Sequence, residues 1–339
     1  MIPHIDIPVS EQSQVGEARR AANRLATDHD LDETVRGRIA IVVTELGNNL
    51  WRHAQKGRLL IGCRRSDEGC QLEVISVDSG PGMSDIARCL RDGYSSGGTP
   101  GTGLGAVQRL STDFSVFSSP GKGTVILSRT WVPAAGAPGS PSLRARFAHA
   151  GICLAAPGEV LSGDAWDIRL DGDGDGKATV IVADGLGHGP FAAEASAEAL
   201  KAFGTLRGSP ATLLERAHPA LRATRGAAVS IVELDANAGT VVYAGAGNIS
   251  GRMISGVEDR SLMSQHGTLG VAIRRLQDVT YAWPDHSIVV LHSDGLATRW
   301  NLKEVGGLLQ CDPAVVAGWL LRDFTRGHDD VTIVVLKRG

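Results

Sequence analysis

The second half of the chain contains four acidic positions that could converge on one metal site. Asp164 precedes an expected strand, and Asp184 ends the next expected strand. The turn signal DGDGDG at 171–176 lies midway between them, so a hairpin would bring both carboxylates to one edge of a sheet. Asp294 and Asp329 also lie at the ends of expected strands. Converging like charges are costly unless cations bind among them, so this spacing predicts a site for hard divalent metals.

Each of these acidic features also has a simpler interpretation. An Asp-Gly pair on its own is more often a turn than a ligand. The segment from Asp171 could be an EF-hand loop, but its twelfth position is Val182 instead of Glu, which favours a hairpin turn. Asp330 is an alternative ligand to Asp329 because the two are adjacent. His188 in GLGHG could protonate a leaving group, although a role in the turn is the better prediction.

The first half presents polar side chains along one face of an expected helix. Glu45, Asn49 and His53 follow one another at steps of four, which stacks them on one side of that helix. A carboxylate and an amide presented together suit Mg²⁺ and a proton acceptor, since magnesium prefers oxygen ligands. A solvent-facing polar stripe is the simpler interpretation of this helix alone, and His53 is better explained as a structural histidine.

Two glycine-rich segments follow that helix. Asp78 ends an expected strand and begins DSGPGM, where its carboxylate could accept a hydrogen bond from an exocyclic amine such as that of adenine. The segment GGTPGTGLG at 97–105 then opens a helix, and its glycines would let backbone N–H groups approach a polyphosphate. A flexible linker would explain one such segment equally well. The specific signal is the order of all three segments.

This order resembles the GHKL ATPase and kinase superfamily, and within it the anti-sigma and switch serine kinases of the RsbT, RsbW and SpoIIAB type. TELGNNLWRHA is similar to their N box, and DSGPGM and GTGLG are similar to their two glycine boxes. The resemblance covers residues 2–132 and implies a two-layer α/β (Bergerat) domain that binds ATP with Mg²⁺. It implies Glu45 as general base, Asn49 as Mg²⁺ ligand and Asp78 as adenine ligand. The residues implied to line the phosphates are Gly82, Gly103, Leu104 and Gly105.

The second half resembles the PP2C-like phosphatases of the SpoIIE and RsbX branch. The matching motifs are SGDAW, VIVADGLGHGPFAAEASAEAL, YAGAGNIS, VLHSDGL and HDDVTIVVLK, within residues 148–337. The resemblance implies an α+β domain, a β-sandwich flanked by helices, that holds two Mn²⁺ or Mg²⁺ ions. It implies that Asp184 bridges the metals with the Gly185 carbonyl on one of them, that Asp294 and Asp329 hold the other, and that Asp164 acts catalytically nearby. No arginine placed to hold the phosphate is evident from the sequence.

A segment of Ala, Gly, Pro and Ser, Ala134–Ser142, separates the two halves. It has no apolar period and two helix-breaking prolines, so we expect a domain at 1–133, a linker at 134–142 and a domain at 143–339. We expect helices at 10–27, 32–54, from about 104, 190–205 and 210–224, and strands at 58–63, 71–78, 114–118, 124–129, 166–170, 177–183, 228–234, 240–244, 287–292 and 331–337.

Composition narrows the class of protein. The chain has 339 residues and a net charge of −3, which gives no electrostatic reason to expect nucleic acid or a membrane surface as partner. Its five cysteines are widely spaced without a CxxC pair, which favours free thiols over a disulfide frame or a zinc knuckle. Neither a signal peptide nor a transmembrane span is evident, so the cytoplasm is the expected compartment.

A kinase domain and a phosphatase domain in one chain resemble a fusion of RsbT and RsbX functions. That resemblance implies a bifunctional bacterial partner-switching regulator whose substrate is a Ser or Thr of a STAS-domain antagonist protein. The alternative is a phosphatase whose first domain senses ATP, or binds a sigma factor or another regulator, without kinase turnover. Intact Glu45 and Asn49 favour catalysis. The oligomeric state, the signal and the preferred metal are not predicted.

Overall fold

The computed structural model describes residues 3–91, 103–134, 147–171, 176–302 and 304–338. It divides into two compact units, residues 2–141 and 142–339. The predicted linker lies outside the described residues except for Ala134. None of the described helices is long and apolar enough to cross a membrane.

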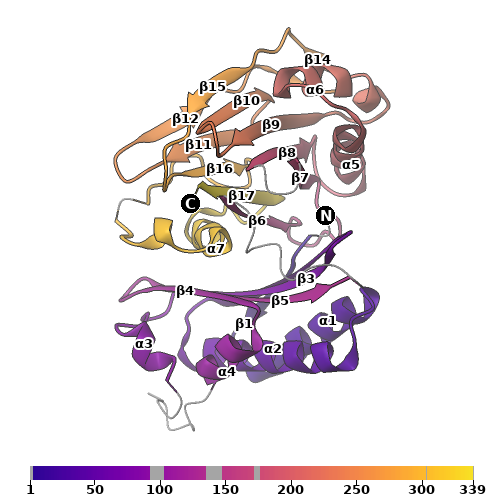
Figure 1. Cartoon of the computed structure of the whole chain (residues 1–339). Coiled ribbons are helices and arrows are strands. Elements are labelled where there is room, and N and C mark those ends of the chain that lie inside the picture. The colour runs from indigo at the N-terminus through magenta and orange to yellow at the C-terminus, as the bar shows by residue number, and fades with distance from the viewer. Residues whose placement is uncertain (1–2, 92–102, 135–146, 172–175, 303, 339) are drawn as a thin grey trace. The chain divides into compact units, whose positions relative to one another are not determined.

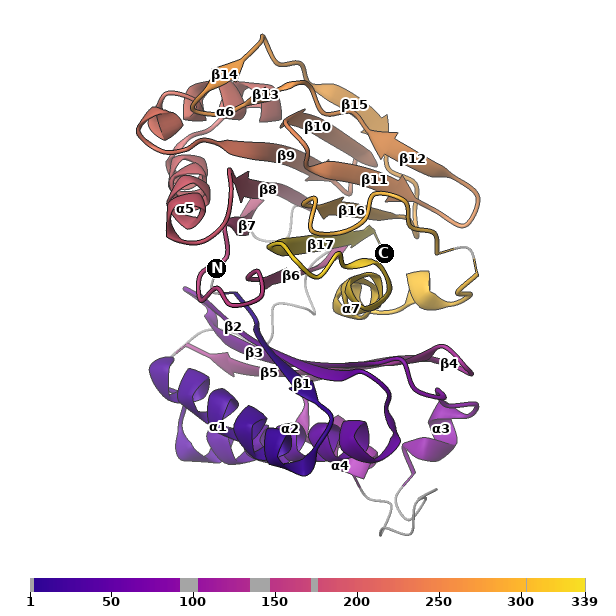
Figure 2. The ribbon, with the colours of Figure 1, turned by 180° about the vertical axis from the view of Figure 1, so that it is seen from behind.

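The first unit is a sheet covered by helices on one face (Figure 1, Figure 2). Its elements are β1 (Ile5–Val9), α1 (Gln12–Asp28), α2 (Glu33–His53), β2 (Gly57–Ser66), β3 (Gly69–Asp78), α3 (Ile86–Cys89), α4 (Gly103–Leu110), β4 (Asp113–Ser119) and β5 (Gly123–Pro133). The strands lie in the order β1-β2-β3-β5-β4, and every neighbouring pair is antiparallel. Helices α1, α2 and α4 pack on the covered face, which makes the predicted two-layer α/β fold.

Helix α2 forms because its apolar residues follow the helical period. Ile39, Val43 and Leu46 are fully buried in the core between the helices and the sheet. Asp32 caps the start of the helix, where its carboxylate accepts a hydrogen bond from the Val35 N–H at 2.8 Å. The buried stripe fixes the rotation of α2, so that Glu45 and Asn49 lie half-buried beside it.

The second unit is a β-sandwich with helices outside it. Its elements are β6 (Phe147–Leu154), β7 (Asp164–Asp171), β8 (Lys177–Gly185), α5 (Pro190–Thr205), α6 (Pro210–Ala217), η2 (Ala220–Ala223), β9 (Ala227–Asp235), β10 (Thr240–Ala246), β11 (Ser250–Ile254), β12 (Asp259–Leu262), β13 (Gly267–Thr268), β14 (Ala272–Ile273), β15 (Val279–Ala282), β16 (Ile288–His292), η3 (Leu308–Gln310), α7 (Pro313–Phe324) and β17 (Val331–Arg338). This is the predicted β-sandwich flanked by helices.

The sandwich consists of two five-stranded antiparallel sheets, β15-β10-β9-β8-β7 and β12-β11-β16-β17-β6. A shared core between them includes the large buried side chains of Trp166, Tyr243 and Trp283. Helices α5 and α6 lie against the first sheet, and α7 lies against β6 and β17 of the second.

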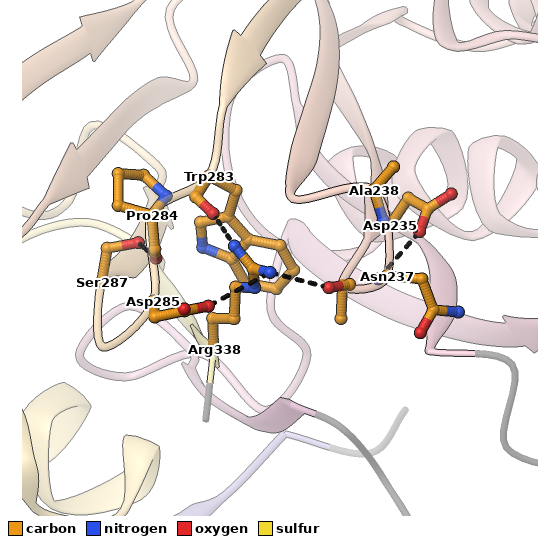
Figure 3. Close-up of polar contacts among 9 residues, drawn as sticks. Asp235, Asn237, Ala238, Trp283, Pro284, Asp285, Ser287 and Arg338 are labelled. Carbon is orange, nitrogen blue, oxygen red and sulfur yellow. Dashed lines mark hydrogen bonds and ion pairs between the residues drawn. The ribbon is translucent and has the colours of Figure 1, made fainter.

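The end of β17 is tied to the other sheet of the sandwich (Figure 3). Arg338 donates hydrogen bonds to the backbone carbonyls of Trp283 and Ala236, the second at 2.9 Å. The same guanidinium pairs with Asp285 at 3.1 Å. Because Trp283 and Ala236 directly follow strands of the first sheet, these bonds join the two sheets at this end.

One expected element is wrong in extent and several were not predicted. The expected helix at 210–224 ends at Ala217, because Pro219 lacks an N–H donor, and continues only as the short turn η2. Strands β1, β6 and β11 to β15 and helices α3 and α7 were not predicted. The apolar run Pro313–Leu321 in α7 has no amphipathic period by which a surface helix would be found.

All five cysteines are free thiols, as expected. Two of them nevertheless lie close together, which their spacing in the sequence did not indicate. Cys63 on β2 and Cys70 on β3 are buried in the core of the first unit, with sulfur atoms 3.0 Å apart and the His29 ring within reach.

Candidate nucleotide and metal sites

Glu45 lies against the start of α4. Glu45 and Asn49 are half-buried on α2, one helical turn apart. A methyl group placed on Gly103 would lie 2.5 Å from Glu45 Oε2, so the carboxylate lies directly against the start of the helix and a larger residue would displace it. The structure therefore brings the predicted N box and the start of the second glycine box together. Leu104 and Gly105 follow as buried residues of α4, and residues 97–102 of the predicted box lie outside the described residues.

Asp78 is held at the end of the central strand β3, beside the end of α2. Its Oδ1 accepts a hydrogen bond from the Gly80 N–H at 2.7 Å. The next residue, Ser79, donates its N–H to the Gln55 carbonyl at 2.9 Å, directly after α2. These bonds fix the carboxylate predicted to bind adenine relative to the helix that carries Glu45.

Gly82 occupies a position that no other residue could take without a shift of the backbone. Its φ is +69°, and an added Cβ would lie 2.3 Å from the Ser119 carbonyl oxygen. The Pro81 carbonyl accepts a hydrogen bond from the Gly121 N–H at 2.8 Å. The first glycine box is thus packed against the turn between β4 and β5.

In the second unit, the predicted hairpin register of β7 and β8 is confirmed. Asp164 lies directly opposite Asp184, and Asp171 lies opposite Lys177. The segment DGDGDG lies between these two paired strands, and its residues 172–175 lie outside the described residues. Because strands instead of helices flank the segment, it joins a hairpin and is no EF-hand.

Asp164 is buried and oriented by a serine of a neighbouring strand end. The Ser293 hydroxyl donates to Asp164 Oδ2 at 2.6 Å, and the same hydroxyl oxygen accepts from the Thr332 N–H at 2.9 Å. Burial and the negative charge of Asp184 raise the pKa of Asp164 well above its usual range. The hydroxyl bond fixes the direction of this carboxylate.

Asp184 is at the centre of the acidic cluster. Burial, followed by the charges of Asp294, Asp329 and Asp330, raises the pKa of Asp184 to about 7. Its Gly185 neighbour has no room for a side chain, because an added Cβ would lie 2.0 Å from the Ala192 carbonyl oxygen. The structure therefore brings Asp164, Asp184, Asp294 and Asp329 to one edge of the sandwich, as their spacing predicted.

The two adjacent aspartates near the end of the chain have different surroundings. Both carboxylate oxygens of Asp330 accept backbone hydrogen bonds, from Ala156 at 2.8 Å and from Gly163 at 2.9 Å. Asp329 is half-buried and accepts only the N–H of Asp330, at 2.9 Å, among the contacts that the described residues make with it. Asp330 is thus committed to the backbone, which leaves Asp329 as the better candidate ligand.

His188 lies in the loop between β8 and α5, with its side chain mostly exposed. Its Nδ1 is 2.8 Å from Glu159 Oε1. This contact places the histidine at the margin of the acidic cluster and gives it an acidic partner in the loop before β7.

Comparison with known proteins gives a family match for each half of the chain. The model of the histidine kinase-like ATPase domain matches residues 9–129. The model of stage II sporulation protein E (SpoIIE) matches residues 174–339. The serine/threonine-protein kinase RsbT of Bacillus subtilis (strain 168) is 34% identical over 116 residues, which cover 34% of this chain and 86% of that protein. The first part of the chain belongs to the family of RsbT, and the second part matches the SpoIIE family model.

Two solved structures are similar to part of the chain. One, reported with the bacterial stressosome as a modular system adapted to control secondary messenger signalling, is 26% identical with a TM-score of 0.50. It covers 56% of this chain and 99% of its own. The other, RsbX in complex with magnesium, is 22% identical with a TM-score of 0.49, and covers 57% of this chain and 96% of its own. The family models and the similarity to RsbT show that the chain joins an RsbT-related, kinase-like ATPase domain to a SpoIIE phosphatase domain.

Two residues of the SpoIIE domain were missed by sequence reasoning as part of the site. Asn248 donates its side-chain N–H to Asp294 Oδ2 at 2.8 Å, and Ser293 holds Asp164. Asn248 lies in the motif YAGAGNIS, which carried the family resemblance, and Ser293 directly precedes Asp294. The motifs indicated that Asn248 and Ser293 could belong to the site. They did not indicate which side chain each residue contacts, because those contacts depend on pairing between strands that are far apart in the sequence.

Proposed function

We propose that the chain is a bifunctional partner-switching regulator that acts on a STAS-domain protein. The ATPase domain phosphorylates a Ser or Thr of that protein with Mg-ATP, and the SpoIIE domain removes the phosphoryl group with two Mn²⁺ or Mg²⁺ ions. The domains extend over 1–133 and 143–339, joined by the linker 134–142. The proposal places both reactions in the cytoplasm, where ATP is available.

The observation that carries the phosphatase part is the cluster of carboxylates around Asp184, which itself has no donor. No described residue donates a hydrogen bond or a positive charge to the Asp184 carboxylate, and burial together with the charges of three other carboxylates raises its pKa to about 7. Such an arrangement is stabilised when divalent cations bind, and an all-oxygen donor set suits Mg²⁺ or Mn²⁺. The residues present therefore fit the metals that the family resemblance implies.

In the proposed phosphatase site, Asp184 and the Gly185 carbonyl would hold one ion, and Asp184, Asp294 and Asp329 the other. When bound, divalent cations lower the pKa of a coordinated water and neutralise phosphoryl charge. Asn248 orients Asp294 through its amide, and Ser293 orients Asp164 toward Asp184 across the hairpin. Because both donors are neutral, they fix Asp294 and Asp164 without placing a positive charge that would compete with the metal ions.

In the proposed kinase site, Glu45 accepts the proton of the incoming Ser or Thr hydroxyl. Its carboxylate lies at the start of α4, whose first residues Gly103, Leu104 and Gly105 would offer backbone N–H groups to a polyphosphate. Asn49 would hold Mg²⁺ one turn further along α2, and Asp78 would accept from the adenine amine. Phosphoryl transfer then depends mainly on positioning and charge neutralisation.

The similarity of the first domain to RsbT, named as a serine/threonine kinase, supports turnover over ATP sensing. Partner choice rests on resemblance alone: RsbT and a stressosome-associated chain are among the relatives. The second candidate function is a phosphatase whose first domain senses ATP or binds a sigma factor or another regulator. The retained Glu45 beside Gly103 favours the kinase.

Replacement of Glu45 separates the two candidates. In a protein whose phosphatase is silenced by Asp184→Asn, we expect transfer of the ATP γ-phosphoryl group to the STAS protein. Adding Glu45→Ala should lower that rate by about 100-fold or more, because a general base contributes that much, while ATP affinity stays within a few-fold. If the Asp184→Asn protein binds ATP but transfers nothing, the sensing or binding function is correct instead.

A further inference from the structure

Arg225 lies beside the loop that follows the central aspartate of the phosphatase site. It directly precedes β9, which pairs with β8 so that Ala227 lies opposite Gly185. The Leu186 N–H donates to the Gly226 carbonyl at 2.9 Å, which joins the two segments just beyond the strands. A methyl group placed on Gly187 would lie 3.1 Å from Arg225 Nη1. The guanidinium therefore packs directly against GLGHG.

This guanidinium has no acidic partner among the residues that the structure describes. Its one described side-chain contact is the ring of Phe191, at 4.8 Å from the ring centroid. Other arginines of the same domain are paired: Arg252 with Asp259 and Arg338 with Asp285. An exposed arginine stacked on an aromatic ring keeps its five N–H donors available to a ligand while the ring limits its conformations.

The position of Arg225 puts it within reach of a phosphoryl group at the acidic cluster. Gly187 is two residues beyond Gly185, so their Cα atoms are at most about 7.6 Å apart. A planar guanidinium forms two parallel hydrogen bonds to phosphate oxygens. Beside four carboxylates, an unpaired cation also offsets the repulsion that an anionic substrate meets on approach.

We propose that Arg225 binds the phosphoryl group of the phosphatase substrate, positioned by Phe191. This inference rests on the proposed phosphatase function and names the arginine that the sequence did not reveal. Arg326 is a rival: its N–H donates to the Gly295 carbonyl at 2.9 Å, next to Asp294. The structure gives the side chain of Arg326 no contact with the loops of the site, whereas Arg225 touches one.

The test uses the full-length protein with Mn²⁺ and p-nitrophenyl phosphate, which presents a phosphoryl group without a protein surface. We expect Arg225→Ala to lower kcat/KM about 10- to 100-fold, mainly through KM, as expected for loss of charged hydrogen bonds. The inhibition constant of inorganic phosphate should rise in parallel, and Arg225→Lys should recover part of the loss. Arg222→Ala, an exposed arginine three residues upstream, is the matched charge control and should be unchanged.

A second readout does not depend on turnover. Binding of inorganic phosphate to the Mg²⁺-loaded protein, followed by phosphorus NMR, should weaken in Arg225→Ala while the affinity for Mn²⁺ stays unchanged. The inference is overturned if phosphate binding and the kinetics with p-nitrophenyl phosphate are unchanged, if only Mn²⁺ affinity falls, or if Arg326→Ala alone has the expected effect. A wild-type protein that binds phosphate through Arg225 but hydrolyses neither a phosphoprotein nor the aryl phosphate would contradict the phosphatase function and leave the phosphate site standing.

Discussion

Asp329 and Asp330 are neighbours in the chain, yet their carboxylates have different tasks. Asp330 accepts two backbone hydrogen bonds from the segment between β6 and β7, which ties the end of the chain to the loop before Asp164. Asp329 lies within the cluster that raises the pKa of Asp184. The sequence offered both residues as ligands, and only the hydrogen bonds separate them.

Asparagine at each position should therefore give opposite results. Asp330→Asn places an amide N–H against a backbone N–H, so we expect a loss of about 1–3 kcal/mol in the free energy of unfolding. Asp329→Asn should leave stability in chelator unchanged or slightly higher, because it removes a like charge, and should weaken Mn²⁺ binding. Thermal unfolding in chelator and Mn²⁺ titration measure the two effects. Weak metal binding with normal stability in Asp330→Asn would reverse the assignment.

Glu73 is a buried carboxylate in the first domain that contacts His4 and Arg129. Burial acts to raise its pKa, but the hydrogen bond with His4 at 2.9 Å and the charge of Arg129 outweigh burial and lower the pKa to about 2. Gly62 makes room for the His4 ring, since an added Cβ would lie 2.6 Å from His4 Nε2. The three side chains join β3 to β5 and to the residue before β1.

This lowered pKa predicts acid sensitivity of the ATPase domain. The folded-state pKa lies below the unfolded value, so the stabilisation is present above about pH 4.5 and is lost as the pH falls toward 2. We expect a loss of about 2 kcal/mol between pH 6 and pH 3 from this group. Glu73→Gln should be less stable at pH 7 and should lose less stability over the same range. Urea unfolding at several pH values measures this, and an unchanged pH dependence in Glu73→Gln would contradict the assignment.

Among the elements, the connection between β8 and α5 has the least freedom. Gly185 packs against the Ala192 carbonyl, and Gly187 and Gly189 both have positive φ, 89° and 72°. The loop can follow this path only with glycine at these points. It thereby holds Gly185 against the first turn of α5 and Gly187 against Arg225.

Alanine at two glycines tests this constraint. Gly185→Ala puts a Cβ 2.0 Å from a backbone oxygen, so we expect lower stability and loss of most phosphatase activity. Gly204, within α5, has nothing within 4 Å of an added Cβ. Gly204→Ala should keep full activity and gain about 0.5–1 kcal/mol, because alanine favours the helix. Equal activity of the two variants would show that the loop tolerates displacement.

The elements that sequence reasoning found share a clear local period. Helix α2 was predicted from Ile39, Val43 and Leu46, and the hairpin of β7 and β8 from the turn between Asp164 and Asp184. Strand β6 and helix α7 were missed because the first begins near the linker and the second is apolar without a period. Their places depend on pairing and packing with β17, which local patterns do not contain.

For the whole molecule, motif order predicted more than residue periodicity did. The order of the N box and the glycine boxes predicted the fold of the first domain, and the order of the four acidic strand ends predicted the fold of the second. Both orders also predicted that the residues of each set lie close together. The supporting donors Asn248 and Ser293, and the roles of Asp330 and Arg225, could not be predicted. They depend on contacts between strands and loops far apart in the sequence, which the motifs do not specify.

The central claim is that the two domains act in opposite directions on one substrate. The most direct test is intact-mass analysis of a candidate STAS protein incubated with Mg-ATP, Mn²⁺ and the full-length chain, either wild type or Asp184→Asn. We predict that the singly phosphorylated STAS protein accumulates with Asp184→Asn and not with wild type. The claim is contradicted if the phosphorylated form accumulates equally with both proteins. It is also contradicted if neither produces it, although Asp184→Asn binds ATP and another kinase phosphorylates the same STAS protein.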